Sequence, residues 1–387
     1  MNDSLPPQFE RYQRGSLIVG LVVLALCVAG GFHNSTQFFR SYLVAFIFWT
    51  GVGLGCMAIL MLHHMVGGTW GFALRRLLES GSKTLPLMGV LVIPLLLSLP
   101  KLYSWATPAG AAEAASPFKH VYLSRPFFLG RTVLYFVVWI ALAYILNKWS
   151  ADQDRTGEPG ILRRLQNLSG PGLLAYGLTV TYASVDWAMS LQPEFFSTIY
   201  GMIFMVTQAL SAMALVTVMV MLLSDRKPLS GVVTPLLFND FGNLLLTFTM
   251  LWAYLSFSQY LIIWEGNLQD EIPWYVVRAE GGWAWVALAL IIFHFAIPFV
   301  LLLMRFIKRR KRILAAVAAG LVVMSVVDIY WLTVPAFERR GPEFHLLDWG
   351  TIIGMGGLWM WLFLSQLKAK PLLPLHDPRL EEVLPHG

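Results

Sequence analysis

Ten long apolar stretches dominate this sequence of 387 residues and leave little chain outside them. Each approaches or exceeds the roughly 20 residues that a helix needs to cross about 30 Å of hydrocarbon. Inside a bilayer the backbone must satisfy its own hydrogen bonds, which a helix does within one segment. We therefore predict an all-α polytopic membrane protein, with residues 1–387 forming a single integral membrane domain. The predicted spans are 16–33, 38–66, 84–105, 126–148, 171–192, 196–223, 240–264, 281–305, 312–335 and 347–367.

The composition agrees with this class, since 57% of the residues are hydrophobic and only 13% are charged. Soluble domains carry about 25% charged residues. The net charge of +6 is spread over the segments between spans. It does not indicate a nucleic-acid-binding surface.

Basic residues set the predicted orientation, because Lys and Arg concentrate in the cytoplasmic loops of membrane proteins. With the N-terminus in the cytoplasm, 20 of the 28 Lys and Arg residues fall on the cytoplasmic side. We therefore expect both termini inside, including a cytoplasmic tail at 368–387. Long loops are expected at 106–125 outside and at 149–170 inside. The polar start of the chain has no cleavage signature, so the first span is expected to be retained.

Cysteine and histidine positions argue against a redox centre held by this chain. Cys27 and Cys56 lie within predicted spans, and no Cys-x-x-Cys motif is present. His63 and His64 would point about 100° apart on a helix, so they do not form a pair of ligands. We expect no metal, haem or iron–sulfur cluster bound by this chain. His63 and His64 are interpreted instead as a titratable access point for protons on the cytoplasmic side.

The segment GVGLGCM contains three glycines at alternate positions in the middle of an apolar span. A dinucleotide-binding fingerprint needs a strand before its glycines and a helix starting at them. Gly51 and Gly55 are four residues apart, a spacing at which small residues let two membrane helices approach closely. We predict a helix-packing site here.

Polar side chains recur along the predicted span 240–264. Six of them are spaced 3, 4, 7, 4 and 7 residues apart, which places all six within an arc of about 60° on a helix. They are Asp240, Asn243, Thr247, Tyr254, Ser258 and Glu265. Thr249, Ser256 and Gln259 lie off this stripe, and Leu251 forms an apolar gap in it. We interpret the stripe as one wall of a polar pathway through the membrane.

Asp186 lies near the end of the predicted span 171–192. A carboxylate inside a membrane helix costs about 2.5–3.5 kcal/mol on insertion scales, so it is expected to have a partner or a function. Thr179, Tyr182 and Ser190 share its side of the helix, within an arc of about 80°. Arg40 and Arg131 begin spans at the same depth and are candidate partners.

Together these groups suit a proton relay, because they occur at cytoplasmic, central and outer depths. They are His63, His64 and Asp240 at the cytoplasmic side, His294 at the centre, and Asp186, Asp328 and Glu265 at the outer side. The alternative is that they tie helices together, at about 0.6 kcal/mol for each hydrogen bond. No catalytic residue is assigned.

Three segments closely resemble one family, the F subunit of bacterial alternative complex III, a quinol:cytochrome c oxidoreductase. They read FFRSYLVAFIFWTGVGLGCMAILMLHHMVGGTWG, DWAMSLQPEFFSTIYG and SQYLIIWEGNLQDEIPWY. The resemblance extends over essentially the whole chain. Wider relatives are the membrane subunits of polysulfide and nitrite reductase complexes, so the resemblance implies two four-helix bundles plus extra helices. It assigns a probable role to Asp186, Glu265, His63 and His64, which lie in the matching motifs.

The resemblance also implies partners in the bacterial cytoplasmic membrane. They are a homologous ten-helix subunit that holds the main quinol site, a periplasmic iron–sulfur subunit and haem c subunits. The expected function is to support assembly of this respiratory complex and to provide a proton-translocation pathway. The chain itself would hold no cofactor, although quinone or quinol binding is an alternative.

Two alternatives to the proton pathway stay open. One is a second quinone-binding subunit, with a cleft near Tyr182, Asp186 and His294. The other is a stand-alone secondary transporter, a class that often has matched broken helices near the midplane. Pro94, Pro235 and Pro298 do not form such a matched pair, which disfavours the transporter.

Overall fold

The computed structural model describes residues 7–112, 117–158, 160–374 and 377, and every regular element in this part of the chain is helical. Nine segments of it are long and apolar enough to cross a membrane. By helix length and hydropathy this is a multi-pass membrane protein, which confirms the predicted class. The nine segments are Phe9–His33, Ser35–Val66, Trp70–Leu97, Arg125–Thr156, Tyr200–Leu223, Pro235–Glu265, Gly281–Leu303, Lys311–Ala336 and Leu346–Lys368.

Most of these segments are single helices that agree with the predicted spans. They are α1 (Pro7–His33), α2 (Ser35–Val66), α9 (Arg125–Thr156), α11 (Tyr200–Leu223), α12 (Pro235–Glu265), α17 (Lys311–Thr333) and α18 (Leu346–Lys368). The segment 281–303 combines three elements, α14 (Gly281–Ala289), the π-helical η4 (Leu290–Ala296) and α15 (Ile297–Leu303).

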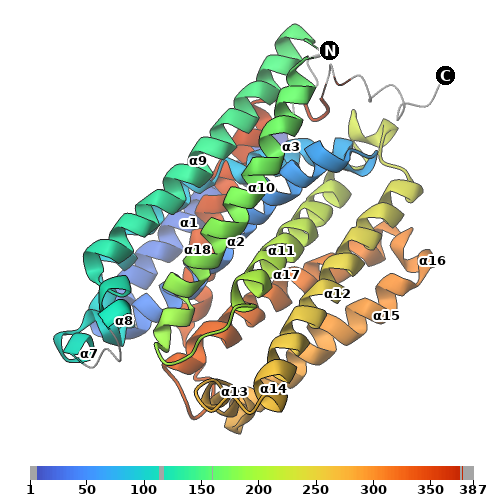
Figure 1. The fold of residues 1–387 in the computed structure, drawn as a ribbon. Coiled ribbons are helices and arrows are strands. Elements are labelled where there is room, and N and C mark those ends of the chain that lie inside the picture. The colour runs from blue at the N-terminus through green and yellow to red at the C-terminus, as the bar shows by residue number, and fades with distance from the viewer. Residues whose placement is uncertain (1–6, 113–116, 159, 375–376, 378–387) are drawn as a thin grey trace.

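A tenth long helix, α10 (Gly160–Trp187), has no stretch as apolar as the one that each of the nine segments contains. It packs against α2, α9 and α11, and it runs alongside α9 through the bundle (Figure 1). Helix α10 therefore occupies the place of the predicted span 171–192. Its length suits a crossing, but its composition differs from that of the other nine.

The predicted span 84–105 is wrong in its bounds, because this part of the chain is a series of short helices. They are α3 (Trp70–Ser82), α4 (Leu85–Leu91), α5 (Ile93–Leu97) and α6 (Leu99–Leu102). Pro86, Pro94 and Pro100 each lie in the first turn of one of the last three. Proline lacks the N–H that would continue a helix and is best accommodated in the first turn, so each of these three restarts the helix.

The long inner loop predicted at 149–170 is also wrong, because both neighbouring helices extend into it. Helix α9 continues to Thr156, and α10 begins at Gly160. Gly157 ends α9 in the left-handed conformation, with a φ of 63°, which favours glycine. The polar residues of this region therefore lie on helices, and some of them face other helices.

Helix contacts divide the chain into two groups of four and a peripheral pair (Figure 1). The first bundle contains α2, the segment α3–α6, α9 and α10. The second bundle contains α11, α12, the segment α14–α15 and α17. Helices α1 and α18 pack on each other and against α2. Helix α2 contacts α11 as well, and this contact joins the two bundles.

Glycines make the joint between α2 and α11 close. A Cβ atom on Gly55 would lie 2.0 Å from the Gln208 carbonyl oxygen, and one on Gly51 would lie 3.1 Å from Gln208 Cγ. Both glycines are in the middle of a continuous helix. The structure therefore confirms the packing interpretation of the glycine motif.

The start of α1 and the end of α18 lie at the same end of the molecule (Figure 1). Lys368 Nζ is 2.9 Å from Glu10 Oε1 there. Beyond α18 the chain folds back onto the first bundle, where Leu372 and Leu373 are buried. Most of the predicted tail after residue 374 lies outside the described residues.

Candidate functional site

Asp186 is fully buried in the first bundle and is held by two side chains of α9. Arg131 donates to both carboxylate oxygens, from Nε at 2.9 Å and from Nη2 at 2.7 Å. The Tyr135 hydroxyl donates to the same carboxylate at 2.7 Å. The Arg131 guanidinium lies 3.8 Å from the centre of the Tyr122 ring, which covers it. A bidentate pair of this kind fixes α10 to α9, so Arg131 is the partner that the sequence left open.

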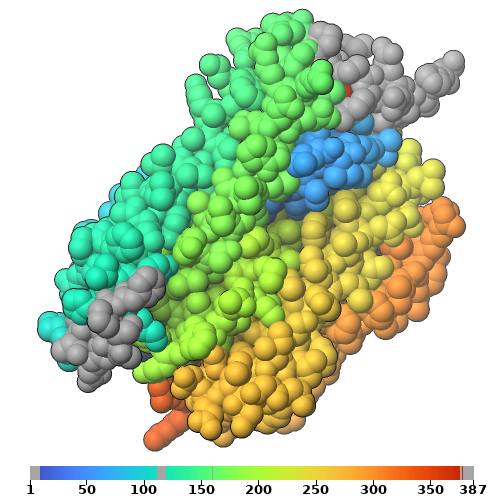
Figure 2. All heavy atoms as spheres, viewed as in Figure 1, coloured from blue at the N-terminus to red at the C-terminus, as the bar shows by residue number. Residues whose placement is uncertain are grey.

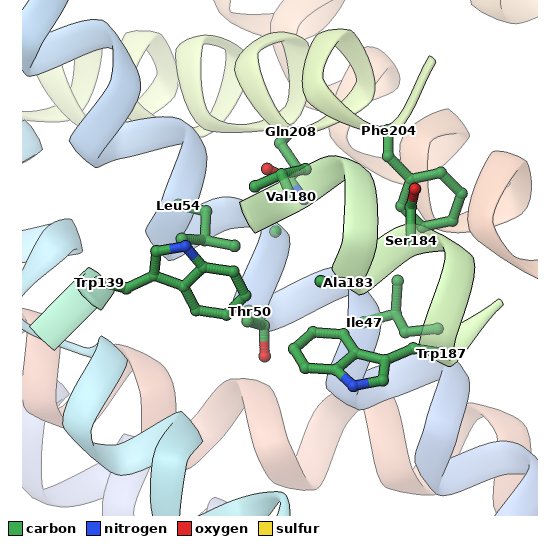
Figure 3. Close-up of a pocket in the computed structure, with 11 residues that line it drawn as sticks. Ile47, Thr50, Leu54, Trp139, Val180, Ala183, Ser184, Trp187, Phe204 and Gln208 are labelled. Atoms are coloured by element: carbon green, nitrogen blue, oxygen red, sulfur yellow. The ribbon is translucent and has the colours of Figure 1, made fainter. Parts of the chain in front are cut away.

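A small cavity lies at the joint between the two bundles, lined by residues of α2, α9, α10 and α11. Its volume is about 10 Å³, room for about one water molecule. Figure 3 shows the Trp139 and Trp187 rings on one side and Gln208 across from them. Gln208 accepts a hydrogen bond from Tyr176, and Trp139 donates one to Thr179. This cavity is far too small for a quinone ring.

Asp328 is the corresponding buried carboxylate of the second bundle, and it is only 2% exposed. The Thr207 hydroxyl donates to its Oδ2 at 2.9 Å, and Trp252 Nε1 donates to the same atom at 3.1 Å. Among the residues that the structure describes, no Lys or Arg forms an ion pair with it. Two neutral donors therefore hold a carboxyl group that has no compensating positive charge.

His294 lies next to this carboxyl group, across the Trp252 ring. It is fully buried, and its ring is perpendicular to that of Trp252 at a centroid distance of 4.4 Å. In the described part of the chain neither ring nitrogen has a hydrogen-bond partner. His294 belongs to the π-helical turn η4, and such turns within α-helices are frequent at functional sites. Trp252 thus contacts both Asp328 and His294.

His63 and His64 are both fully buried at the end of α2. His64 Nδ1 lies 3.3 Å from the Ser169 hydroxyl on α10. The His63 ring packs against Trp70 at 4.9 Å, and a Cβ atom on Gly71 would lie 2.0 Å from it. The start of α3 therefore covers His63. The two histidines are not open to solvent in this structure, although the sequence suggests an access point.

The polar stripe of α12 does not line the interior of this chain. Asn243, Thr247, Tyr254 and Glu265 are exposed, and Asp240 and Ser258 are partly buried. The side chains that face the core are instead Thr249 and Gln259, which lie off the stripe. Helical spacing correctly groups the six residues on one face, but this face points away from the bundle. The stripe therefore does not connect with Asp186, Asp328 or His294.

A buried cluster of charges, which the sequence did not indicate, closes the end of the first bundle near the termini. Arg75 and Arg76 of α3 both bind Glu79, which is 1% exposed. From the C-terminal segment, Lys370 binds Glu79 at 3.0 Å and Asp377 binds Arg75 at 3.0 Å. Ser150, Gln153 and Asp154 of α9 complete the cluster. The spacing of Arg75, Arg76 and Glu79 at three and four residues is the signal that could have revealed it.

At the opposite end, two of the resembling segments contact each other. Gln192 accepts a hydrogen bond from Arg278, Ser197 donates to Gln259, and the Phe195 and Trp274 rings stack at 4.7 Å. Arg278 also donates to the carbonyl groups of Trp331 and Leu332 near the C-terminal end of α17. Burial lowers the pKa of Arg278 to about 9. Carbonyl groups at helix ends carry partial negative charge, so they stabilise this cation without a carboxylate.

The residues proposed for quinone binding do not share a site. Tyr182 is 50% exposed on the outside of α10, whereas Asp186 is buried behind it in its ion pair. His294 belongs to the second bundle, where η4 packs on α12, α14, α15 and α17. Among the described residues no group of three or more His, Cys, Asp or Glu could hold a metal ion.

Comparison with known proteins adds no assignment. No protein-family model matches the chain, and no curated protein matches it.

Proposed function

We propose that this chain is a membrane subunit of a respiratory quinol:cytochrome c oxidoreductase of the alternative complex III type. It would lie in the bacterial cytoplasmic membrane with both termini inside and hold no cofactor. Its partners would be the homologous quinol-binding subunit, the iron–sulfur subunit and the haem c subunits. Two features support this: the resemblance of three long segments, and the grouping of helices into four, four and two, with α10 as a tenth crossing.

One observation carries the proposed proton role, and it lies in the second bundle. Asp328 is buried without a cation, and Trp252 separates it from a buried histidine in a π-helical turn. Ionisable residues inside membrane helices are rare and mark ion or proton routes. Asp328 and His294 would therefore act as separate protonatable sites of such a route, with His63 and His64 as further groups near the cytoplasmic side.

Asp186 receives a different role in this proposal. Its charge is matched by Arg131 within a closed set of hydrogen bonds. Removing one partner of a buried ion pair costs about 3–5 kcal/mol, so the pair suits a structural tie. The stripe residues of α12 are left out of the route because they face outward.

The test compares Asp328→Asn with Asp186→Asn in the purified complex reconstituted in liposomes. Asparagine keeps the size and an accepting oxygen but removes the titratable charge. We expect Asp328→Asn to assemble normally and to transfer electrons from quinol to cytochrome c, with fewer protons moved per electron. Asp186→Asn, the matched control, should assemble in smaller amounts, and the surviving complex should move protons normally.

Two results would contradict the proposal at different levels. If a fully assembled Asp328→Asn complex moves the normal number of protons per electron, Asp328 serves only to tie helices together. Purification of the chain without haem c and iron–sulfur subunits, together with transport by the chain alone, would favour the secondary transporter. The quinone alternative would require quinone bound by this subunit near Tyr182, Asp186 and His294, which do not share a site because His294 belongs to the second bundle.

A further inference from the structure

The turn between the apolar segments 281–303 and 311–336 carries a dense positive charge. Six of the eight residues from 305 to 312 are Lys or Arg, and no acidic residue occurs in the sequence between Glu280 and Asp328. The turn is therefore not neutralised by its own part of the sequence. The basic residues are Arg305, Lys308, Arg309, Arg310, Lys311 and Arg312.

The two lysines hold this turn on the protein. Lys308 is 7% exposed, and its Nζ donates to the Asn243 amide oxygen of α12 at 2.6 Å. Lys311 Nζ forms an ion pair with Asp225 at 2.5 Å, in the segment that follows α11. The short helix α16 (Arg305–Lys308) is part of the turn and lies at the edge of the second bundle (Figure 1). The turn is thus fixed to two neighbouring parts of the chain.

The four arginines of the turn face outward instead. All four are exposed, and among the described residues no carboxylate forms an ion pair with any of them. Figure 2 shows the turn, in orange, at the surface of the molecule. These side chains are Arg305, Arg309, Arg310 and Arg312.

The basic residues at the corner between α9 and α10 have a different environment. Acidic residues alternate with them there, so that Arg155 binds Asp152 and Arg164 binds Glu158. A basic corner of this chain can therefore be neutralised internally. The lack of acidic partners for the arginines of the turn is a particular feature of the turn.

The turn lies close to the depth of lipid headgroups. Only residues 304–310 separate two segments that are each long and apolar enough to cross a membrane. The headgroup region is roughly 5–8 Å thick on each side of the hydrocarbon, so a turn of this length stays near it. Leu303 and Phe306 are 55% and 57% exposed beside the arginines, which suits the boundary between acyl chains and headgroups. A soluble acidic protein would match the charge but would offer no such apolar layer.

We propose that this turn binds the headgroup phosphate of an anionic phospholipid. The arginines would donate to the phosphate oxygens, and Leu303 and Phe306 would contact the acyl chains. A guanidinium group can bind two phosphate oxygens at once, and clusters of four to eight basic residues beside a membrane helix are typical of anionic-lipid binding. The inference goes beyond the respiratory role and does not require it, because it rests on the charge of the turn and its place between two apolar segments.

Lipid binding by the purified full chain tests the proposal without any variant. The chain is stripped of lipid in a neutral detergent, and native mass spectrometry measures the binding of phosphatidylglycerol and of phosphatidylcholine with the same acyl chains. We expect phosphatidylglycerol to bind at least about tenfold more tightly, because only its headgroup has a net negative charge. Equal binding of the two lipids would overturn the proposal. Displacement of phosphatidylglycerol by inorganic phosphate, but not by chloride at equal ionic strength, would indicate a site for free phosphate instead.

A triple variant locates the site on the chain. Arg309→Gln, Arg310→Gln and Arg312→Gln together should remove the preference for phosphatidylglycerol. The matched control combines Arg155→Gln, Arg163→Gln and Arg164→Gln at the corner between α9 and α10, and it should keep the preference. Equal loss in both triple variants would show that net charge alone determines lipid binding.

A benzophenone amino acid in place of Phe306 identifies the occupant in the native membrane. We expect an adduct with phospholipid, detected as an increase in the mass of the peptide that contains position 306. A discrete band at the summed mass of two polypeptides would mean that a protein covers the turn, and the proposal would then be wrong.

Discussion

The two bundles each bury one carboxylate near the same end of the molecule, but they treat its charge differently. Asp186 lies one residue before the end of α10, and Asp328 lies five residues before the end of α17. Arg131 donates twice to Asp186, whereas only Thr207 and Trp252 donate to Asp328. Arg278 connects the segments that follow these two helices, through Gln192 and Leu332.

The two carboxyl groups therefore suit different roles, one in the stability of the bundle and the other in proton exchange. A buried carboxylate bound by a bidentate arginine has its charge matched and ties two helices together. A buried carboxyl group held by neutral donors keeps its hydrogen bonds in both protonation states, and only its charge changes. The first arrangement suits assembly, and the second suits proton exchange.

The largest effect is expected from breaking the ion pair of the first bundle. Arg131→Met leaves Asp186 buried without its cation, which costs about 3–5 kcal/mol. The amount of protein in the membrane should fall sharply. Adding Asp186→Asn should restore much of it, because the neutral side chain still accepts from Tyr135. Equal loss in the single and double variants would mean that Arg131 acts through packing.

A smaller effect is expected at the joint between the bundles. Gly55→Ala places a methyl group against the Gln208 carbonyl of α11, and overpacking of this kind costs about 1–3 kcal/mol. Gly320→Ala on α17 is the matched control, since nothing lies within 4 Å of its Cβ position. The midpoint temperature of thermal aggregation in detergent should fall only for Gly55→Ala. A similar change in both would show that helix propensity, not the contact, determines the result.

Asp328→Asn should change stability little, in contrast with Asp186→Asn. Its amide oxygen can still accept from Thr207 and Trp252, so the expected loss is within about 1 kcal/mol, the net value of one hydrogen bond. The midpoint temperature of thermal aggregation, measured for both variants, checks that Asp186→Asn is the less stable of the two. A larger loss of thermal stability in Asp328→Asn than in Asp186→Asn would mean that Asp328, not Asp186, is the structural tie.

The smallest effect on stability is expected for His294→Phe. Phenylalanine keeps an aromatic ring beside Trp252 and removes two buried nitrogens that have no described partner. The thermal midpoint should stay the same or rise, while proton movement by the complex should fall. His294→Ala should destabilise the protein because it leaves a cavity. Full proton movement in His294→Phe would exclude the histidine from the route.

The sequence determined the class of this protein and most of its helices. A long apolar run in a membrane favours a helix, which satisfies its own backbone hydrogen bonds, and the described residues contain nine helical segments long and apolar enough to cross a membrane. Pro86, Pro94 and Pro100 divide the third predicted segment into short helices, because proline lacks the N–H that would continue the hydrogen bonding of the preceding turn. The spacing of Gly51 and Gly55 correctly predicted a close helix contact, since only a missing side chain permits one.

Only the tertiary structure decided which way each polar face points. In a soluble protein a polar stripe faces water, but lipid chains are as apolar as a helix interior, so periodicity groups residues without orienting them. In the folded chain the stripe of α12 faces outward, and Thr249 and Gln259 take the inner positions. The choice of Arg131 for Asp186, and the absence of any cation from the contacts described for Asp328, also depend on how helices pack. Those pairings join residues far apart in the chain, and local sequence carries no record of them.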